Sequence, residues 1–474
     1  MGQDNLEEMR EVEVTICPYW DEDTVSELDI FVVADQKKIN PGDILFRFQK
    51  ETVTIPFCPV SEIRVEDDKG EMPYSEEEWE EYPVQYRSFL AERQGSGKIK
   101  IFYHVKTRDI TGITQYGPYF DFRSERGGAN GAGVTCMPLL PEGEYQISLK
   151  WNMEHMPENT RGVWSFGEGN QIRRGRAELL LYTFYAVGMV QSVEEENFGF
   201  YWFGTPPFDV KRAAENVKQM YFVMSRFFED ASMEGYRVFA RKDPFEKSGG
   251  TALSRSFLFG YNDTTKTTVE SLQNLLAHEM VHNWPHMEDH PYGSCTWFTE
   301  GCAEFYSVML PLRANLVSLR DTLEQIQKRT DEYFTNPTVS LSNEDAAKLF
   351  WKDRRTQRIS YGRGFFFLAN VDSMIRKATR GEKSVDDVVK PLTSMYLSGK
   401  SGTNEDFIRL VNEVAGVNIS GDFEKMEKGE RLVPDPDGFD GHFSWEKVER
   451  EIAGGKEKTT SYQWKIKMGE CDEN

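Results

Sequence analysis

The sequence predicts a multidomain α+β protein, with an N-terminal antiparallel β domain, a mixed central domain and a C-terminal helical region. Its length of 474 residues corresponds to about three domains. Hydrophobic residues make up 39% of it, including 32 Phe, which is enough to fill a large core. After Pro206 and Pro207 the period of apolar residues changes from two residues toward 3.6 residues, which indicates a change from strands to helices.

Residues 1–190 form the predicted β domain. Apolar residues alternate or run together at 12–16, 28–32, 98–102 and 177–181, and turn-forming residues such as those at 40–43 separate these segments. Short strands joined by turns are typical of antiparallel sheets. The acidic run at 62–81 is expected to be a solvated surface loop.

The central domain is predicted at 191–390 and the C-terminal helical region at 391–474. Two strand-like segments, 236–240 and 251–261, lie between the first two predicted helices. Helical spacing of apolar residues predicts helices over the following ranges: 210–228, 269–284, 296–310, 365–375 and 404–414.

Charge and cysteine content limit the partners and the compartment. With 56 Lys and Arg against 78 Asp and Glu, the net charge of −22 disfavours nucleic acid and anionic membranes as partners. No segment reaches the roughly 18–20 apolar residues of a membrane helix, and the acidic N-terminus does not resemble a secretory signal. Six scattered cysteines indicate reduced thiols. We therefore expect a cytoplasmic protein; its oligomeric state is not predicted.

The strongest local signal is a cluster of histidines. Four of the seven fall between positions 278 and 290, and residues 278–282 read HEMVH, an HExxH motif. On a helix that Pro285 terminates, His278 and His282 lie one turn apart on one face and can bind the same Zn²⁺. Glu279 then lies beside the metal, where it can take a proton from water.

An HExxH motif needs a third ligand. Glu300 is the best candidate, because it opens a second helix within the segment Trp-Phe-Thr-Glu-Gly and completes a His-His-Glu set with a position left for water. His286 and His290 continue the four-residue spacing, but Pro285 interrupts the helix that would align them. Glu304, one turn after Glu300, either accepts the outer N–H of a zinc-bound histidine or is a surface carboxylate.

These motifs resemble the gluzincin peptidases of clan MA, whose catalytic domain is thermolysin-like. Within the clan, His-Asn-Trp after the motif and Trp-Phe-Thr-Glu-Gly are more similar to the glycyl aminopeptidase family than to the family of aminopeptidase N and leukotriene A4 hydrolase. The segment Ser-Tyr-Gly-Arg-Gly at 360–364 resembles their Tyr-x-Lys-Gly segment, which implies that Tyr361 stabilises the tetrahedral intermediate. The resemblance covers roughly residues 190–430 and is strongest at the metal site.

The chain departs from these families at the substrate-binding strand. The family motif has a Glu that, in the aminopeptidase N branch, holds the free amine of the substrate. Here the run is Gly249, Gly250, Thr251, Ala252, with Ala252 at the position of that Glu. The glycines keep an edge against which a peptide backbone could pair, but the amine-anchoring carboxylate is missing. A C-terminal PDZ domain, frequent in glycyl aminopeptidases, does not fit into the residues after Gly441.

The predicted function is a zinc-dependent metallohydrolase of the aminopeptidase-like type. Glu279 serves as general base, Tyr361 stabilises the oxyanion, and the substrate is a peptide or a small amide. One alternative, favoured by Ala252, is a zinc enzyme that opens an epoxide or acts as a biosynthetic hydrolase or lyase on a small molecule. A second alternative is a protein that binds zinc without turnover.

Overall fold

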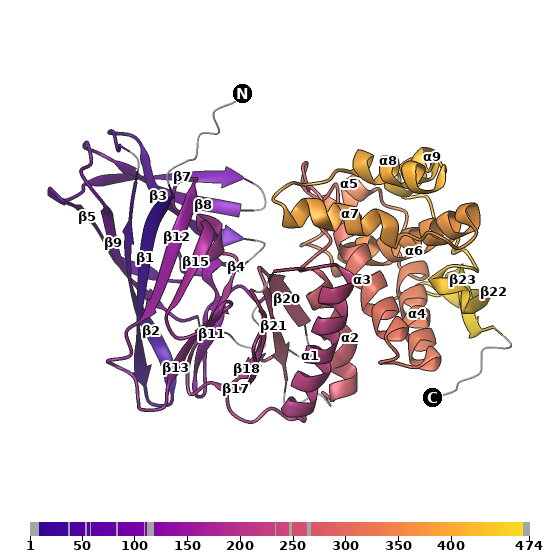
Figure 1. The fold of residues 1–474 in the computed structure, drawn as a ribbon, viewed down its shortest axis with the longest axis horizontal. Coiled ribbons are helices and arrows are strands. Elements are labelled where there is room, and N and C mark those ends of the chain that lie inside the picture. Colours follow the sequence, from indigo (N-terminus) through magenta and orange to yellow (C-terminus); the bar gives the residue numbers. More distant parts are fainter. Residues whose placement is uncertain are drawn as a thin grey trace. The chain divides into compact units, whose positions relative to one another are not determined.

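The protein is described by a computed structural model over residues 9–467, except 37, 53–54, 57, 82–83, 109, 111–117, 233, 246–248 and 263–266. The chain folds into two compact units. Unit 1 contains residues 1–215 and 232–272, and unit 2 contains residues 216–231 and 273–474. The division crosses two helices, α1 (Val210–Phe227) and α2 (Val269–Val281), which are labelled in Figure 1. The predicted division into three domains, at 190 and 390, stays a prediction.

Unit 1 is built from strands, shown in indigo to magenta in Figure 1. Its largest sheet has seven strands in the order β15-β12-β1-β2-β9-β5-β6. The pairs are antiparallel except β1 with β12, which run parallel. The strands of this sheet are β1 (Arg10–Asp21), β2 (Thr24–Ala34), β5 (Val60–Asp67), β6 (Gly70–Glu71), β9 (Ile99–Lys106), β12 (Glu144–Trp151) and β15 (Gln171–Arg176).

Two smaller sheets complete the first part of unit 1. One is β4-β3-β8-β7, and the other is β10-β11-β16-β13-β14. Their strands are β3 (Ile44–Thr52), β4 (Ile55–Pro56), β7 (Tyr74–Glu81), β8 (Val84–Ala91), β10 (Arg123–Glu125), β11 (Gly128–Ala132), β13 (Arg161–Trp164), β14 (Gly167–Glu168) and β16 (Phe184–Gly188). Alternate residues of β1, namely Val12, Val14 and Ile16, are at most 1% exposed, so the period of two directs one face of the sheet into the core.

The last sheet of unit 1 is mixed and has the order β17-β18-β19-β21-β20. Its strands are β17 (Gln191–Glu195), β18 (Phe198–Trp202), β19 (Tyr236–Lys242), β20 (Gly249–Leu253) and β21 (Ser256–Tyr261). The central strands β18, β19 and β21 pair in parallel, and β20 closes the sheet as the antiparallel partner of β21. Five successive residues of β18 and all six of β21 are buried, as expected for strands covered on both faces.

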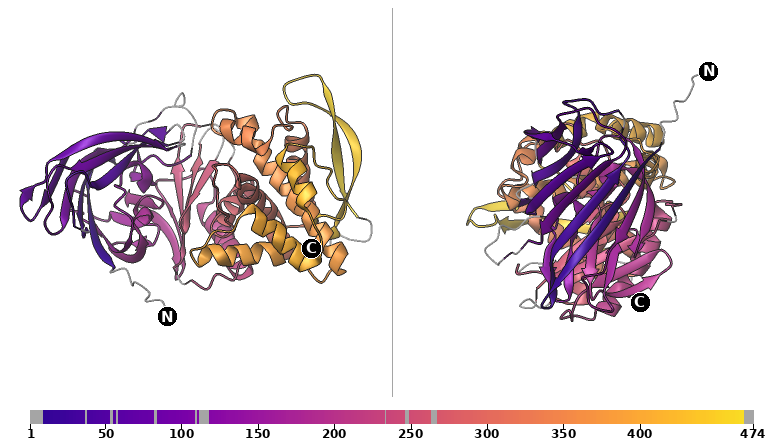
Figure 2. Two further views of the ribbon diagram at one scale, coloured as in Figure 1. Left: turned by 90° about the horizontal axis from the view of Figure 1, so that it is seen from above. Right: turned by 90° about the vertical axis from the view of Figure 1, so that its left-hand side faces the viewer.

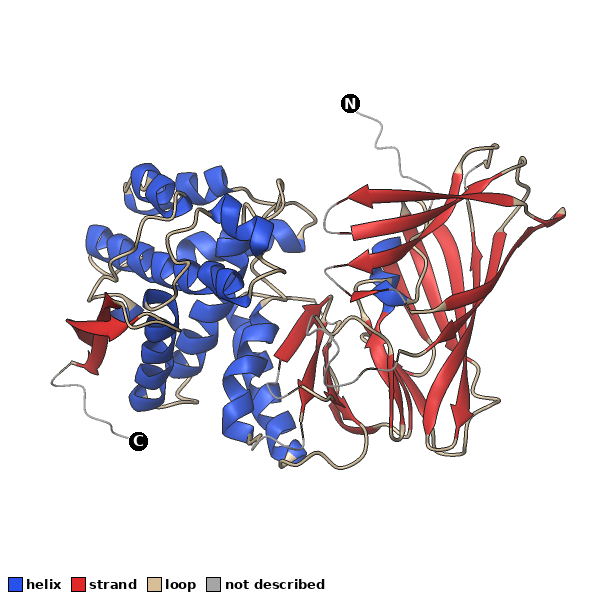
Figure 3. Cartoon of the chain, turned by 180° about the vertical axis from the view of Figure 1, so that it is seen from behind, coloured by secondary structure: helices blue, strands red, loops and turns tan. Residues whose placement is uncertain are grey.

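Unit 2 consists mainly of helices, which are blue in Figure 3. Besides parts of α1 and α2 it contains α3 (Thr296–Arg313), α4 (Leu319–Phe334), α5 (Asn343–Leu349), α6 (Arg354–Thr379), α7 (Asp386–Leu397), α8 (Asn404–Ala415) and α9 (Ser420–Glu427). Helices α3 and α6 form its centre, because most of their residues are buried. The predicted fold class, a multidomain α+β protein with an N-terminal β-rich region, is confirmed.

A β-hairpin of β22 (Phe443–Glu451) and β23 (Lys458–Ile466) follows the last helix, in yellow in Figure 2. The sequence did not predict it, because its outward residues are charged and its alternation is short. It is held by α4: the Trp464 indole donates to Thr330 Oγ1 at 2.8 Å, and Gln327 Oε1 accepts from the Trp464 backbone N–H at 2.9 Å. The C-terminal region is therefore helical only up to α9.

Other sequence expectations differ from the structure in detail. The strand predicted at 177–181 is a 3-10 helix over Ala177–Leu180, because apolar residues three apart turn inward together. The acidic run at 62–81 is not a loop: it lies largely in β5, β6 and β7, where pairing with β8 and β9 orders the backbone. The predicted helix 365–375 is the second half of α6, which begins at Arg354.

None of the helices in the described ranges combines the length and apolar composition needed to cross a membrane. Five cysteines, at positions 17, 58, 136, 295 and 302, are buried and free. The expected reduced state of the thiols stays a prediction. Cys471 and the N-terminal residues 1–8 lie outside the described residues.

Candidate metal centre

The two histidines of the HExxH motif come from the end of α2. His278 lies in its last turn, and His282 lies in the turn that follows Val281. This helix ends three residues earlier than predicted, because a residue before a proline avoids the helical conformation. Backbone hydrogen bonds between residues three apart close the turn instead: the Asn283 N–H donates to the Met280 carbonyl, and the Trp284 N–H donates to the Val281 carbonyl.

Trp284 fixes the end of α2 in unit 2. Its indole is fully buried, stacks on Phe228 with ring centroids 5.2 Å apart, and donates to Asp230 Oδ2 at 3.0 Å. The His-Asn-Trp segment thus serves to hold the turn that carries His282.

Glu300 comes from the first turns of α3, and two features place it. The buried Trp297 indole donates to Asn404 Oδ1 at 3.0 Å and so ties α3 to α8. Gly301 then faces Gly364 of α6 so closely that a Cβ on Gly301 would lie 2.6 Å from the Gly364 backbone. The glycines of both sequence motifs therefore permit the close crossing of α3 and α6, which brings Glu300 and Tyr361 into one site.

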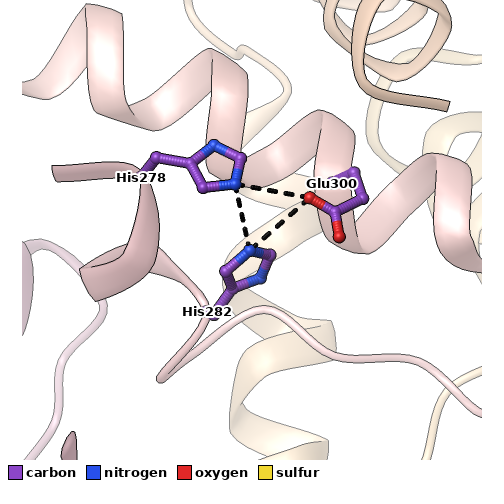
Figure 4. Close-up of side chains that lie close together, drawn as sticks. All are labelled: His278, His282 and Glu300. Atoms are coloured by element: carbon purple, nitrogen blue, oxygen red, sulfur yellow. Dashed lines mark hydrogen bonds and ion pairs between the residues drawn. The ribbon is translucent and has the colours of Figure 1, made fainter. Parts of the chain in front are cut away.

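Three ligand atoms converge in unit 2, as Figure 4 shows. His278 Nε2 and His282 Nε2 are 3.2 Å apart, and Glu300 Oε2 lies 3.3 Å from the first and 3.6 Å from the second. A tetrahedral Zn²⁺ with bonds of about 2.0–2.1 Å requires ligand atoms roughly 3.3–3.4 Å apart. Glu300 Oε2 is also buried without a hydrogen-bond partner among the described residues. The donor set and its spacing thus fit zinc.

Electrostatics in this group favour a bound cation. Burial lowers the pKa of His282 to about 4, so its ring is neutral near pH 7 and has a lone pair to offer. Burial also opposes protonation of His278, but Glu300 and Glu304 outweigh it and raise the pKa. For Glu300, burial raises the pKa, yet the two histidines lower it overall.

Glu279 has the properties of a base beside such a site. Its side chain is 7% exposed and has no hydrogen-bond or ion-pair partner within the described part of the chain. Burial is the main cause that raises its pKa to about 7. A carboxylate that no structural contact engages, with a pKa near neutrality, can both accept and return a proton.

Tyr361 lies against the first histidine. Its ring stacks on His278 with centroids 5.5 Å apart and planes 2° from parallel. Burial raises the pKa of Tyr361 well above its usual value, so the hydroxyl keeps its proton and can donate a hydrogen bond. The guanidinium of Arg358, one turn earlier on α6, lies 4.7 Å from the centre of the Tyr361 ring.

Glu304 faces inward, as one of the two sequence alternatives expects. Its Oε1 lies 3.4 Å from His278 Nδ1, and its Oε2 pairs with Nε of Arg329 from α4. Glu304 is 8% exposed and Arg329 6%. Burial raises the pKa of Glu304, but Arg329, His278 and Arg358 outweigh it and lower the pKa to about 2.

Sequence reasoning missed both arginines. Arg329 lies outside every motif, and nothing in the sequence links α4 to the site. Arg358 carried a weak signal, since it precedes Tyr361 by three positions, which is one helical turn.

The alternative ligands lie apart from the group of three. The His286 ring stacks on Tyr396 of α7 with centroids 4.4 Å apart, and its Nδ1 is buried without a partner among the described residues. His290 is exposed in the loop between α2 and α3.

The predicted substrate-binding run, residues 249–252, belongs to unit 1. It forms β20, the last strand of its sheet, in which Ala252 pairs with Phe257 of β21. One edge of β20 has no partner strand among the described strands, so it could accept an extended peptide.

Comparisons with known proteins agree with the motifs. Residues 271–361 match the model of the M61 glycyl aminopeptidase family. The matched segment begins within α2 and ends at Tyr361. It therefore includes His278, His282 and Glu300. The predicted resemblance to gluzincin metallopeptidases is confirmed.

Solved structures share the fold at low sequence identity. An aminopeptidase N family protein from Idiomarina loihiensis has 12% identity and a TM-score of 0.67, with 92% of this chain and 79% of that chain covered. An M1 zinc metallopeptidase from Deinococcus radiodurans has 13% identity and a TM-score of 0.53, with 90% and 94% covered. The leukotriene A4 hydrolase of Saccharomyces cerevisiae has 12% identity and a TM-score of 0.54, with 90% and 69% covered.

No curated protein sequence is similar enough to be matched. The family match and the shared fold together bear out the prediction of an aminopeptidase-like zinc metallohydrolase. The roles of single residues and the substrate stay predictions.

Proposed function

We propose that the protein is a zinc-dependent hydrolase that cleaves peptides or small amides. The observation that carries this proposal is the convergence of His278, His282 and Glu300 at distances that suit one tetrahedral zinc. Three protein ligands leave a fourth position for water or substrate, which is the arrangement of catalytic rather than structural zinc sites.

The residues around the metal have separate roles in the reaction. Zinc bound there would lower the pKa of water to about 7 and polarise the substrate carbonyl. Glu279 takes a proton from the attacking water on its carboxylate and then delivers it to the leaving amine. The Tyr361 hydroxyl donates a hydrogen bond to the oxygen that becomes negative, and a single donor of this kind contributes about 3–4 kcal/mol. Glu304 orients the His278 ring, because its Oε1 lies 3.4 Å from His278 Nδ1.

The substrate differs from that of an ordinary aminopeptidase in one respect. Ala252 occupies the position of the amine-anchoring Glu in the motif, and a buried cationic amine without a partner is costly. We therefore propose a preference for N-blocked or uncharged substrates. The same substitution favours the second candidate, a zinc hydrolase or lyase acting on a small molecule that is not a peptide.

Metal analysis tests the ligand set. Purified protein should contain about one zinc per chain. His282→Ala and Glu300→Ala should lower this content sharply, because each removes one of three ligands. His290→Ala is the matched control and should keep full occupancy, since His290 is exposed in a loop. Full zinc content in Glu300→Ala would contradict the assignment and point to His286.

A panel of paired substrates tests the specificity. Aminoacyl amides and their N-acetyl forms are compared by kcat/KM on the wild-type enzyme. We expect the acetylated forms to be cleaved at least as well as the free amines. Ala252→Glu should shift the preference toward the free amine by tens of fold, because a hydrogen bond to a charged group contributes about 1.5–3 kcal/mol. A strong wild-type preference for the free amine would refute the proposal.

A further inference from the structure

Arg358 is a cation of the metal centre that the proposed chemistry does not use. It projects from the second turn of α6, and its guanidinium covers the ring of Tyr361 at 4.7 Å. The side chain is 39% exposed. It makes no hydrogen bond within the described residues, although a guanidinium has five N–H donors.

The neighbouring carboxylates leave Arg358 free to bind something else. Its ion-pair partner Glu304 lies 3.9 Å from Nη1, beyond hydrogen-bond distance, and is already engaged by Arg329 and His278. Glu332 of α4 and Glu300 also act on Arg358 electrostatically. Glu332 is exposed to solvent, which screens its interaction, and Glu300 is a proposed metal ligand. Arg329 is different, because it is 6% exposed, donates hydrogen bonds to Gln325 and Asn274, and forms an ion pair with Glu304.

The charges of the site lead to the same conclusion. Zinc would carry two positive charges and Arg329 one. The three carboxylates of the site, those of Glu279, Glu300 and Glu304, balance these charges. Arg358 adds a fourth positive charge next to Tyr361, and the remaining carboxylate that acts on it, Glu332, is exposed to solvent.

From these observations we infer that Arg358 binds a carboxylate of the substrate, so that the enzyme selects substrates with an anionic group close to the cleaved bond. A guanidinium matches a carboxylate with two parallel N–H donors. This inference rests on the proposed function, since it names the substrate class of the same zinc site. Arg358 would be a cationic anchor for the substrate. The Glu that Ala252 replaces in the family motif would be an anionic one.

Hydroxamates test this inference without turnover, because they bind a zinc site as stable ligands. The probes are the monohydroxamates of malonic, succinic and glutaric acid, each paired with the analogue whose free carboxylate is a carboxamide. Titration calorimetry of the zinc-loaded protein measures both members of each pair. For the spacer that fits, the acid should bind about ten- to a hundredfold more tightly than the amide.

Substitution at Arg358 supplies the specific readout. In Arg358→Met the advantage of the acid should disappear while the affinity for the amide stays within about threefold, and Arg358→Lys should restore part of it. Arg355→Met is the matched control on the same helix, because Arg355 pairs with Asp353 and is 65% exposed. It should change neither affinity. The melting temperature of each variant shows that it is folded.

The outcomes separate the two proposals. Equal wild-type affinities for acid and amide at all three spacers, with both binding, would overturn the role of Arg358 and leave the zinc hydrolase intact. Retention of the acid's advantage in Arg358→Met would overturn it as well. Failure of every hydroxamate to bind zinc-loaded protein would refute both.

Peptides then identify the source of the carboxylate. N-acetyl dipeptides with a free C-terminus are compared with their amides, and Asp or Glu side chains with Asn or Gln. Both comparisons use kcat/KM in the wild type and in Arg358→Met. If the wild type prefers the free C-terminus over the amide and Arg358→Met does not, the C-terminal carboxylate is the group that Arg358 binds. If instead it prefers Asp or Glu over Asn or Gln in the same Arg358-dependent way, the group is an acidic side chain. Its absence from both would overturn the inference for peptide substrates.

Discussion

Glu279→Gln should lower kcat by about 10²–10⁴-fold while zinc content and melting temperature stay unchanged. The amide keeps the size of the side chain but cannot accept a proton. Folding should not suffer, because the carboxylate makes no hydrogen bond or ion pair among the described residues. Steady-state kinetics on the preferred substrate, together with metal analysis and thermal unfolding, measure the three quantities.

Two comparisons make this result specific to proton transfer. Tyr361→Phe should lower kcat with little change in KM, because its hydrogen bond forms mainly in the transition state. Glu288→Gln, at an exposed site before α3, should change neither constant. An unchanged kcat in Glu279→Gln would remove the general-base role and favour chemistry in which the metal acts alone.

The largest expected effect on stability is that of Arg329→Met. This substitution removes the nearest cation from the buried Glu304 and leaves only the longer contact with Arg358, at 3.9 Å, and the one with His278. Breaking a buried pair in this way costs about 3–5 kcal/mol. Urea unfolding of the zinc-free protein, followed at pH 7, should show a lower midpoint. The exposed pair of Lys348 and Glu344 is the control, since Lys348→Met should cost less than about 1 kcal/mol.

Removing both charges distinguishes the effect of the ion pair on stability from the effect of side-chain packing. The double variant Arg329→Met with Glu304→Gln should recover part of the lost stability, because no unpaired charge remains in the interior. Weaker zinc binding in the same double variant would show that Glu304 also supports His278. Loss of a carboxylate that contacts a metal-binding histidine costs about 10–100-fold in metal affinity. Equal unfolding midpoints of wild type and Arg329→Met would contradict the buried ion pair.

The same pair predicts a dependence on pH. The pKa of Glu304 is depressed from 4.5 to about 2 in the folded protein. Its contribution is therefore present above pH 4.5 and is lost as the pH falls toward 2. Acid unfolding of the zinc-free wild type should show this loss, whereas Glu304→Gln, which cannot titrate there, should lack it.

The sequence alone was enough to predict the chemistry of the site. An HExxH motif, a Glu in Trp-Phe-Thr-Glu-Gly and a Tyr before a glycine are local patterns, and their spacing on helices specifies which residue types face one another. The positions of most strands and helices followed in the same way, because burial on one face imposes a period of two or 3.6. Where local pattern and packing disagreed, as at residues 177–181 and in the hairpin β22–β23, the prediction was wrong or absent.

Only the tertiary structure decided which distant side chains complete the site. Arg358 stands on α6, whose contact with α3 depends on the close approach of Gly301 and Gly364. Arg329 stands on α4 and reaches α3 through its ion pair with Glu304. No spacing along the chain encodes either contact. The inward direction of Glu304 has the same origin, since a carboxylate on a helix is buried only where a cation from another helix compensates it. Long-range pairing of charges is a property of the packed helices, and for this reason the sequence left it open.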